Sequence, residues 1–166
     1  MKVIEGRAWV FGDNINTDVM APGLYFKSPM EVLARHCLEA VDPTFASGVR
    51  TGDIIVAGRN FGVGSAREQA AMALTHLGVG AVLAVSFGRI FYRNALNFGL
   101  PALTFAEAGT VVAGDLLRVD PVAGRVGNTR SGAVHAVPAI PPHLMAMVEA
   151  GGLMPWLKLR LKKEAV

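Results

Sequence analysis

The sequence predicts an α/β fold with a parallel βαβαβ core, a section of antiparallel strands and C-terminal helices. Three short apolar runs of strand length alternate with two helix-length segments between residues 54 and 105. Such runs suit strands that are buried on both faces and joined by right-handed crossover helices. After residue 115 apolar and polar residues alternate, as is typical of antiparallel strands. At 166 residues we expect one domain, residues 1–166.

The segments before the core are predicted to be short. They are, in order, a strand at residues 8–11, a loop rich in turn formers over 14–23, a helix from about 29 to 40 and a connection over 42–52. The helix is expected because Ser28 can serve as its N-cap and Pro29 suits its first position.

The centre of the core is a strand, a glycine-rich loop and a helix. Ile54–Ala57 is too short for a helix and rich in β-branched residues, which favours a buried strand. Three glycines follow within residues 58–64. We expect Ser65 to begin the helix, because Glu68 three residues later would complete a capping box. The apolar face of that helix has the i, i+3, i+4, i+7 spacing and consists of Ala70, Ala73, Leu74 and Leu77.

The remaining segments complete the predicted fold. They are a strand at residues 81–85, a helix at 88–98, a strand at 101–105, antiparallel strands at 115–119 and 133–137 with a turn at 121–124, and helices at 142–150 and 154–162. Ligands of such sheets bind outside the carboxyl ends of the parallel strands. Residues 62–67 and Ser86 lie at such ends, so we expect the binding site there.

Ser65 and its neighbours allow two interpretations. As an N-cap, Ser65 would stabilise the helix by about 1 kcal/mol. As a reactive hydroxyl at a helix N-terminus, its oxygen could carry a stabilised negative charge. Arg67 favours the second, because a cation at this position suggests a ligand carboxylate or phosphate; the alternative is a solvated arginine. Residues 16–18 form either an Asx-type turn or a loop in which Asp18 orients a catalytic group.

The composition argues against several classes of protein. No apolar run approaches the roughly 18–20 residues of a membrane span, and Glu5 interrupts the N-terminal segment before any secretory signal. The single cysteine, Cys37, excludes a disulfide framework and a cysteine-ligated metal site. The net charge of +3 is densest at residues 158–163, without the interleaved aromatic residues of a nucleic-acid surface. We therefore expect a cytoplasmic protein without a nucleic-acid or membrane partner.

The glycine-rich loop does not match the nucleotide-binding motifs. A P-loop requires a lysine after its last glycine, and none is present. A dinucleotide fingerprint would place a glycine where Arg67 stands. A free-standing serine hydrolase would surround Ser65 with a G-x-S-x-G motif, which is absent.

Four motifs point to a known family. They are residues 12–18, 60–68, 86–94 and 150–156. In their order and spacing the chain resembles, over nearly its whole length, the small subunit of 3-isopropylmalate dehydratase. That subunit corresponds to the swivelling fourth domain of aconitase and shares its plan with homoaconitase small subunits. The resemblance implies a swivelling β/β/α domain.

The same resemblance implies half of a hydro-lyase. Such an enzyme isomerises 2-isopropylmalate to 3-isopropylmalate through isopropylmaleate, in leucine biosynthesis. A large subunit would supply a 4Fe-4S cluster, and this chain would bind no metal. Ser65 matches the serine whose alkoxide removes the proton α to a carboxylate, and Asp18 matches the aspartate that pairs with a histidine of the larger part. The implied substrate-binding residues are Arg67, which grips a carboxylate, Gly64, Lys27 and Thr17.

The chain departs from the family pattern at three positions. The family usually has Cys at Val63, Ser at Ala66 and His at Gln69. The hydroxyl missing at Ala66 binds a substrate carboxylate in aconitase, and such a bond is worth about 1.5–3 kcal/mol. These departures leave a non-catalytic anion-binding regulatory module as an alternative.

The substrate is a second open point. Residues 25–28 match the loop that sets substrate choice in the family. The cation of Lys27 would suit a distal carboxylate, as in homoaconitate, whereas isopropylmalate would prefer an apolar contact. A homoaconitase or methylmalate-type dehydratase small subunit is therefore the alternative enzyme.

Overall fold

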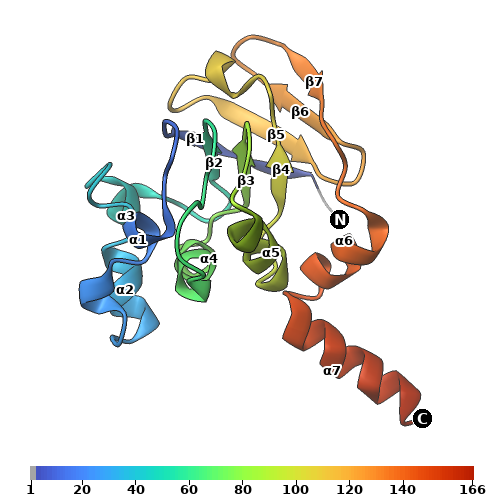
Figure 1. Cartoon of the computed structure of the whole chain (residues 1–166). Helices are drawn as coiled ribbons and strands as arrows, with labels where there is room; N and C mark the ends of the chain where they lie inside the picture. The colour runs from blue at the N-terminus through green and yellow to red at the C-terminus, as the bar shows by residue number, and fades with distance from the viewer. Residues whose placement is uncertain (1–2) are drawn as a thin grey trace.

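The computed structural model describes residues 3–166, which form one mixed sheet with helices against it (Figure 1). The seven strands of this part of the chain have the order β4-β3-β2-β1-β5-β6-β7. The strands are β1 Ile4–Val10, β2 Ile54–Ala57, β3 Ala81–Ala84, β4 Ala102–Thr104, β5 Leu116–Asp120, β6 Arg125–Asn128 and β7 Val134–Ala136. The helices are α1 Thr17–Met20, α2 Met30–Arg35, α3 Phe45–Gly48, α4 Glu68–His76, α5 Arg89–Asn97, α6 Pro142–Glu149 and α7 Leu153–Glu164, with 3-10 turns at η1 Gly23–Tyr25 and η2 Ala108–Thr110.

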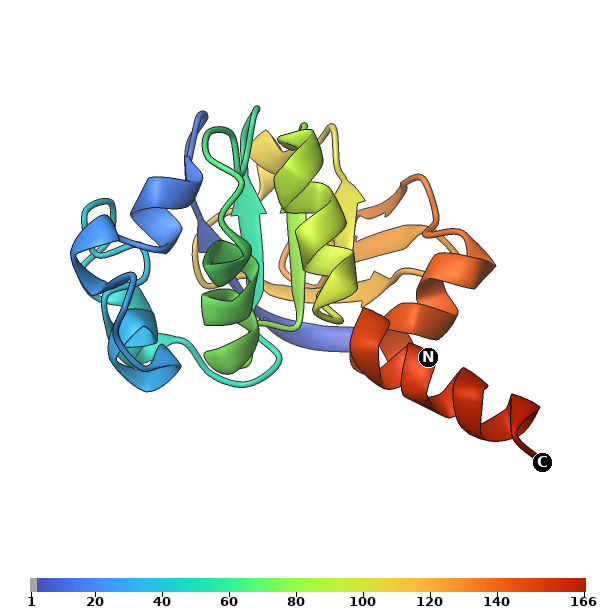
Figure 2. The same cartoon turned by 60° about the horizontal axis from the view of Figure 1, so that its bottom comes forward.

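The parallel half of the sheet confirms the predicted βαβαβ core. β1 pairs with β2, β2 with β3 and β3 with β4, all in parallel. The crossover helices α4 and α5 lie side by side on one face of these strands (Figure 2). The other half of the sheet is antiparallel, as the alternating pattern predicts. It joins the parallel half through the pairing of β1 with β5, and β5 then pairs with β6 and β6 with β7.

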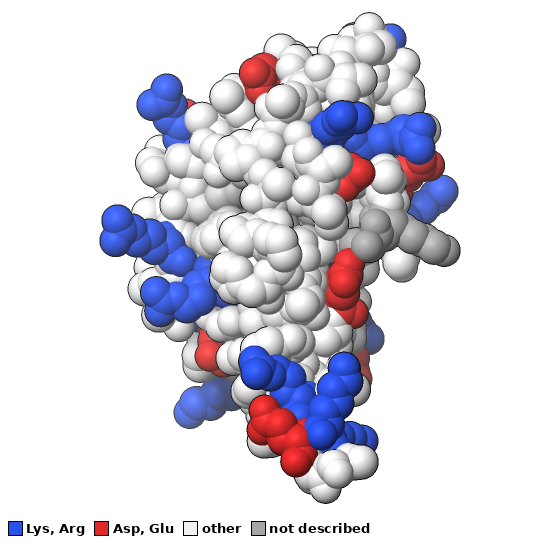
Figure 3. Space-filling model, turned by 90° about the vertical axis from the view of Figure 1, so that its right-hand side faces the viewer, with Lys and Arg blue, Asp and Glu red and all other residues white. Residues whose placement is uncertain are grey.

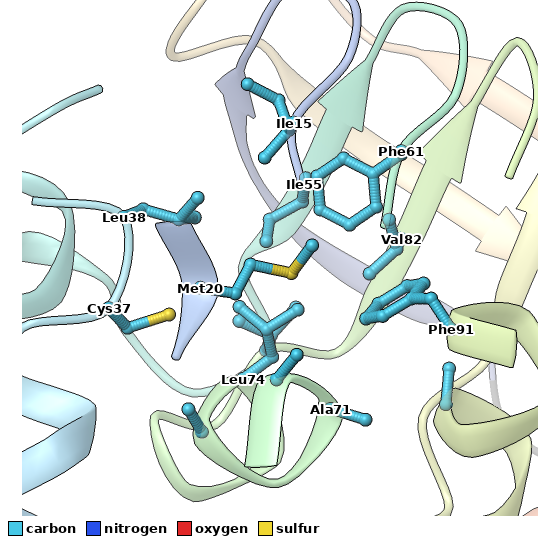
Figure 4. Close-up of a cluster of buried hydrophobic side chains, with 14 of the residues drawn as sticks. Ile15, Met20, Cys37, Leu38, Ile55, Phe61, Ala71, Leu74, Val82 and Phe91 are labelled. Atoms are coloured by element: carbon cyan, nitrogen blue, oxygen red, sulfur yellow. The ribbon is translucent and has the colours of Figure 1, made fainter. Parts of the chain in front are cut away.

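Each central strand supplies two cores because successive side chains point to opposite faces. Ile55 and Val82 pack toward α4, α5 and the helices after β1, where Leu74 and Phe91 meet them (Figure 4). Ile54, on the other face, belongs to a second buried cluster with residues of β5, β6 and α6. Burial on both faces explains why these strands have no polar alternation.

Three local predictions are wrong. The helix expected over residues 29–40 ends at Arg35, and Pro29, not Ser28, is its N-cap residue. Leu38 has φ +61°, and its N–H donates to the Val19 carbonyl at 3.0 Å, so a tertiary contact turns the chain out of the helix. The expected connection 42–52 contains α3. β6 was not predicted, because Val126 is its only large apolar residue and an alternating pattern is therefore not visible.

None of the helices within residues 3–166 combines the length and apolar character that crossing a membrane requires.

Candidate active site

The candidate site lies where the chain leaves the carboxyl ends of β1 and β2. Two loops follow these parallel neighbours, and backbone hydrogen bonds join them. The Gly62 N–H donates to the Ile15 carbonyl at 2.7 Å, and the Thr17 N–H donates to the Val63 carbonyl at 3.0 Å. The two loops therefore form one unit, although they are far apart in the sequence.

A pair of asparagines joins the same loops nearer their tips. Asn14 and Asn60 both have positive φ, +57° and +58°, a conformation that asparagine tolerates better than most residues. The Asn60 Nδ2 donates to the Asn14 Oδ1 at 2.9 Å, and the Ser86 hydroxyl accepts from the Asn60 N–H at 2.9 Å. The sequence analysis did not predict this pair of hydrogen-bonded asparagines. The available signal was that each asparagine follows a strand and lies beside turn-forming residues.

Ser65 lies on the exposed part of the second loop. The Thr17 hydroxyl, on α1, donates to the Ser65 carbonyl at 2.8 Å, and the Arg67 N–H donates to the same oxygen at 2.8 Å. The preceding residue, Gly64, has φ +109°, which strongly favours glycine. The backbone of Ser65 is thus held from both sides while its side chain faces solvent.

The prediction that Ser65 begins a helix is wrong. α4 begins at Glu68, and its N-cap residue is Arg67, with no side-chain cap. The capping box with Glu68 is therefore not formed. The physical reason is the set of bonds to the Ser65 carbonyl, together with the extended conformation of Arg67 (φ −98°, ψ 105°). The N-terminus of α4, which was expected to begin at Ser65 and to stabilise a negative charge there, lies three residues after Ser65.

Thr17, which the resemblance to the family places among the substrate-binding residues, is buried, and so is Gly62. Thr17 is 1% exposed and its hydroxyl is bonded to the Ser65 carbonyl, so it positions Ser65 and does not line an open surface. Gly62 packs inside the domain, where a Cβ would lie 2.2 Å from the Phe91 ring.

The guanidinium of Arg67 is held by three neighbours. Its Nε forms an ion pair with the Asp18 Oδ1 at 3.1 Å, its Nη1 donates to the Ala21 carbonyl at 2.9 Å, and its Cζ lies 5.5 Å from the centre of the Phe26 ring. A guanidinium has five N–H donors. The two contacts to oxygen leave donors on the terminal nitrogens for a ligand, with the plane already oriented.

Arg67 forms one wall of a surface pocket of about 400 Å³. The other walls come from the segment after α1 and comprise Gly23, Leu24, Phe26 and Lys27. Leu24 is 84% exposed and Phe26 43% exposed, so the pocket offers apolar side chains to solvent. Two cations beside an apolar wall can bind a small acid that carries a hydrocarbon substituent. Sequence reasoning found both cations but missed Leu24.

The structure brings most of the predicted site residues together. Asp18 contacts Arg67, and Lys27 shares its pocket. The three departures from the family pattern lie close by: Val63 and Ala66 are exposed, and Gln69 is half-buried in the first turn of α4. Val63 is tied to Thr17 through its carbonyl, a contact that any side chain at this position preserves.

Within residues 3–166 no three His, Cys, Asp or Glu side chains are placed to hold a metal ion. Cys37 is buried beside Leu38 and Met20 (Figure 4), and its burial raises the pKa of its thiol.

Comparison with known proteins identifies close relatives. The model of the aconitase C-terminal domain family matches residues 20–108. The 3-isopropylmalate dehydratase small subunit of Moorella thermoacetica is 46% identical over 163 residues, which cover 96% of this chain and 98% of that protein. The methanogen homoaconitase small subunit of Methanothermobacter thermautotrophicus is 46% identical over 153 residues, covering 92% and 89%.

The fold has a close counterpart among solved structures. A crystal structure of 3-isopropylmalate dehydratase from Methanocaldococcus jannaschii superposes with a TM-score of 0.93 at 38% identity, covering 99% of this chain and 98% of that one.

Proposed function

This chain belongs to the aconitase C-terminal domain family, and on that premise we propose that it is the small subunit of a 3-isopropylmalate dehydratase. The reaction removes water from 2-isopropylmalate and adds it back in the other orientation. The observation that carries the proposal is the pocket that contains the oriented Arg67 guanidinium and the exposed side chains of Leu24 and Phe26. Ser65, which is also exposed, precedes Arg67 by two residues. A carboxylate and an isopropyl group are the chemical features that such a pocket matches.

In this proposal Arg67 binds one carboxylate of the substrate and Ser65 acts as the base. The Ser65 oxygen takes the proton from the carbon α to a carboxylate, next to the carbon that loses the hydroxyl. When water is added back, the hydroxyl joins the carbon that lost the proton, and the proton goes to the carbon that lost the hydroxyl. An alkoxide requires strong electrostatic stabilisation. Two sources of positive potential follow Ser65 directly in the sequence, the guanidinium of Arg67 and the N–H groups at the start of α4. Gly64 permits the left-handed turn that presents the hydroxyl.

A large subunit completes the proposed enzyme. The relatives' names describe small subunits, which implies such a partner. The partner would carry a 4Fe-4S cluster, whose chemistry is to accept the hydroxyl that leaves the substrate. We propose that Asp18, which is 53% exposed, pairs with a histidine of the large subunit in the assembled enzyme, while in the chain alone it holds Arg67. A cytoplasmic location, compatible with the free Cys37 thiol, is part of the same proposal.

A homoaconitase small subunit is the second candidate. Lys27 in the wall of the pocket would suit a distal carboxylate, and a homoaconitase small subunit is among the 46%-identical relatives. The greater share of apolar wall favours isopropylmalate.

The test is reconstitution with the large subunit under anaerobic conditions. The wild-type pair should interconvert the isopropylmalates, and Ser65→Ala should lower the rate at least about a hundredfold while leaving assembly intact. Ser131→Ala, at an exposed serine between β6 and β7, is the matched control and should keep the wild-type rate. Wild-type turnover by Ser65→Ala would remove the serine base from the mechanism, and an inactive wild-type pair would favour an anion-binding module.

A further inference from the structure

α7 projects from the rest of the domain (Figures 1 and 2). It carries an exposed apolar face. None of its twelve residues is buried. Its first turn is anchored, since Leu153 and Trp156 pack against the core and the Arg160 guanidinium lies 4.9 Å from the centre of the Trp156 ring. Beyond this anchor no element within residues 3–166 buries the side chains of the helix.

The exposed face is a stripe of three large apolar side chains. Met154, Leu157 and Leu161 have the i, i+3, i+7 spacing of one helical face and are 62%, 37% and 64% exposed. A helix this short is marginal in water by itself, so most of its stability must come from packing. An ordered helix with an uncovered apolar stripe indicates a contact with another chain.

The charge of α7 decides what kind of chain can cover the stripe. The helix holds four cations, Lys158, Arg160, Lys162 and Lys163, and one acid, Glu164. The chain has 16 Lys and Arg and 13 Asp and Glu, so the remainder holds twelve of each and the formal charge of +3 resides in α7. Figure 3 shows basic side chains, with acidic ones beside them, gathered at the bottom of the view, where the helix projects.

Two copies of this chain are unsuited to pair through the stripe. Lys158 and Lys162 directly follow Leu157 and Leu161, so a second α7 would bring like charges together along the contact. An acidic surface would meet the same lysines favourably. The geometry and charge therefore favour a different, acidic partner over a second copy.

We propose that the face formed by Met154, Leu157 and Leu161 docks into an apolar groove of the large subunit that is bordered by acidic side chains. The inference rests on the proposed function for the identity of the partner. The three side chains are too few for a whole interface, which in stable complexes buries roughly 800 Å² on each partner. α7 therefore contributes one anchor of a larger interface.

The test measures the dissociation constant of the full chain and its cognate large subunit by biolayer interferometry. Leu161→Asp should weaken binding about tenfold or more, because a charge would enter an apolar contact. Leu159→Asp is the matched control: Leu159 is 53% exposed but lies away from the stripe, and binding should change by less than about twofold. Met154→Asp, near the helix start where an acid favours the helix, tests the stripe without loosening α7.

Charge is tested separately. Lys158→Glu with Lys162→Glu should weaken binding and reduce its dependence on salt. Wild-type affinity in both aspartate variants of the stripe would overturn the inference. So would sedimentation of the isolated wild-type chain as a dimer that Leu161→Asp dissociates, since the occupant would then be a second copy. A complex that depends on α7 but does not interconvert isopropylmalates would overturn the proposed function and leave this inference standing.

Discussion

The hydroxyl of Thr17 donates a 2.8 Å hydrogen bond to the carbonyl of Ser65, 48 residues later in the chain. This bond joins the first turn of α1 to the loop that follows β2. It holds the backbone of the proposed base without engaging its side chain. Thr17 is thus a positioning residue, and its effect should be visible in turnover more than in substrate binding.

Thr17→Val should lower kcat about tenfold with little change in KM, because the isosteric side chain cannot hold the Ser65 carbonyl. Thr17→Ser retains the hydroxyl and should restore most of the rate. Steady-state kinetics of the reconstituted enzyme separate the two constants. An unchanged kcat in Thr17→Val would show that the Arg67 N–H alone suffices to fix Ser65.

Arg67→Lys should raise KM about tenfold or more, because an ammonium lacks the planar fork that binds a carboxylate with two hydrogen bonds. Arg118→Lys is the matched control. Arg118 forms a 2.7 Å ion pair with Glu5, and both side chains are more than half exposed. Arg118→Lys should therefore leave KM unchanged. Equal effects of the two substitutions would contradict a specific role for Arg67.

Lys27→Leu distinguishes the two candidate substrates. Lys27 lies in the same pocket as Leu24 and Phe26. If isopropylmalate is the substrate, the change enlarges the apolar wall and kcat/KM should be kept or improved. If a third carboxylate binds there, kcat/KM for homoaconitate should fall about tenfold. Parallel assays with both acids provide the measurement, and a loss confined to isopropylmalate would contradict the proposed fit.

Gly62→Ala should destabilise the domain by about 2 kcal/mol or more. Gly62 has φ +81°, and a Cβ there would meet the Phe91 ring at 2.2 Å. Gly109→Ala is the control, since a Cβ at Gly109 meets nothing within 4 Å and should shift stability by less than about 0.5 kcal/mol. Urea unfolding of both variants gives the comparison. Equal midpoints would contradict the close packing described here.

Asp53 should make stability depend on pH in the acid range. Burial alone would raise the pKa of Asp53, but hydrogen bonds from the Trp9 indole and from the N–H groups of Arg50 and Arg7 outweigh it and hold the pKa below its usual value. The unfolded chain therefore binds the proton more readily. This contribution is complete above the unfolded pKa, about 3.9, and is lost as pH falls through the lower folded pKa.

The measurement is urea unfolding between about pH 6 and pH 3. Wild type should lose stability at the acid end of this range. Asp53→Asn should be less stable near neutral pH and lose less on acidification. A wild-type stability that rises on acidification through this range would contradict the direction of the shift.

Periodicity in the sequence was sufficient to predict the core of the fold. β2, β3, β4 and the bodies of α4 and α5 occur where apolar runs and helical spacing place them. These elements are buried on one or both faces, and burial leaves a repeating pattern that local reading detects. The resemblance of the loop motifs to those of a known family supplied Ser65, Arg67 and Asp18 as candidates.

Tertiary contacts decided what the local pattern could not. A capping box at Ser65 was chemically reasonable, yet the Thr17 hydroxyl holds the Ser65 carbonyl and α4 starts three residues later. The contact between Arg67 and Asp18 likewise joins two distant segments, since Asp18 lies in α1 and Arg67 is the N-cap residue of α4.

The sequence by itself determined the order of strands and helices in the parallel core and named Ser65, Arg67 and Asp18 as candidate site residues. Only the tertiary structure decided where α4 begins, how the Arg67 plane is oriented and that the stripe on α7 stays uncovered. The physical reason is the distance along the chain over which each kind of interaction acts. Propensity and periodicity act over a few residues, whereas these features depend on hydrogen bonds, ion pairs and packing between segments that the fold brings together.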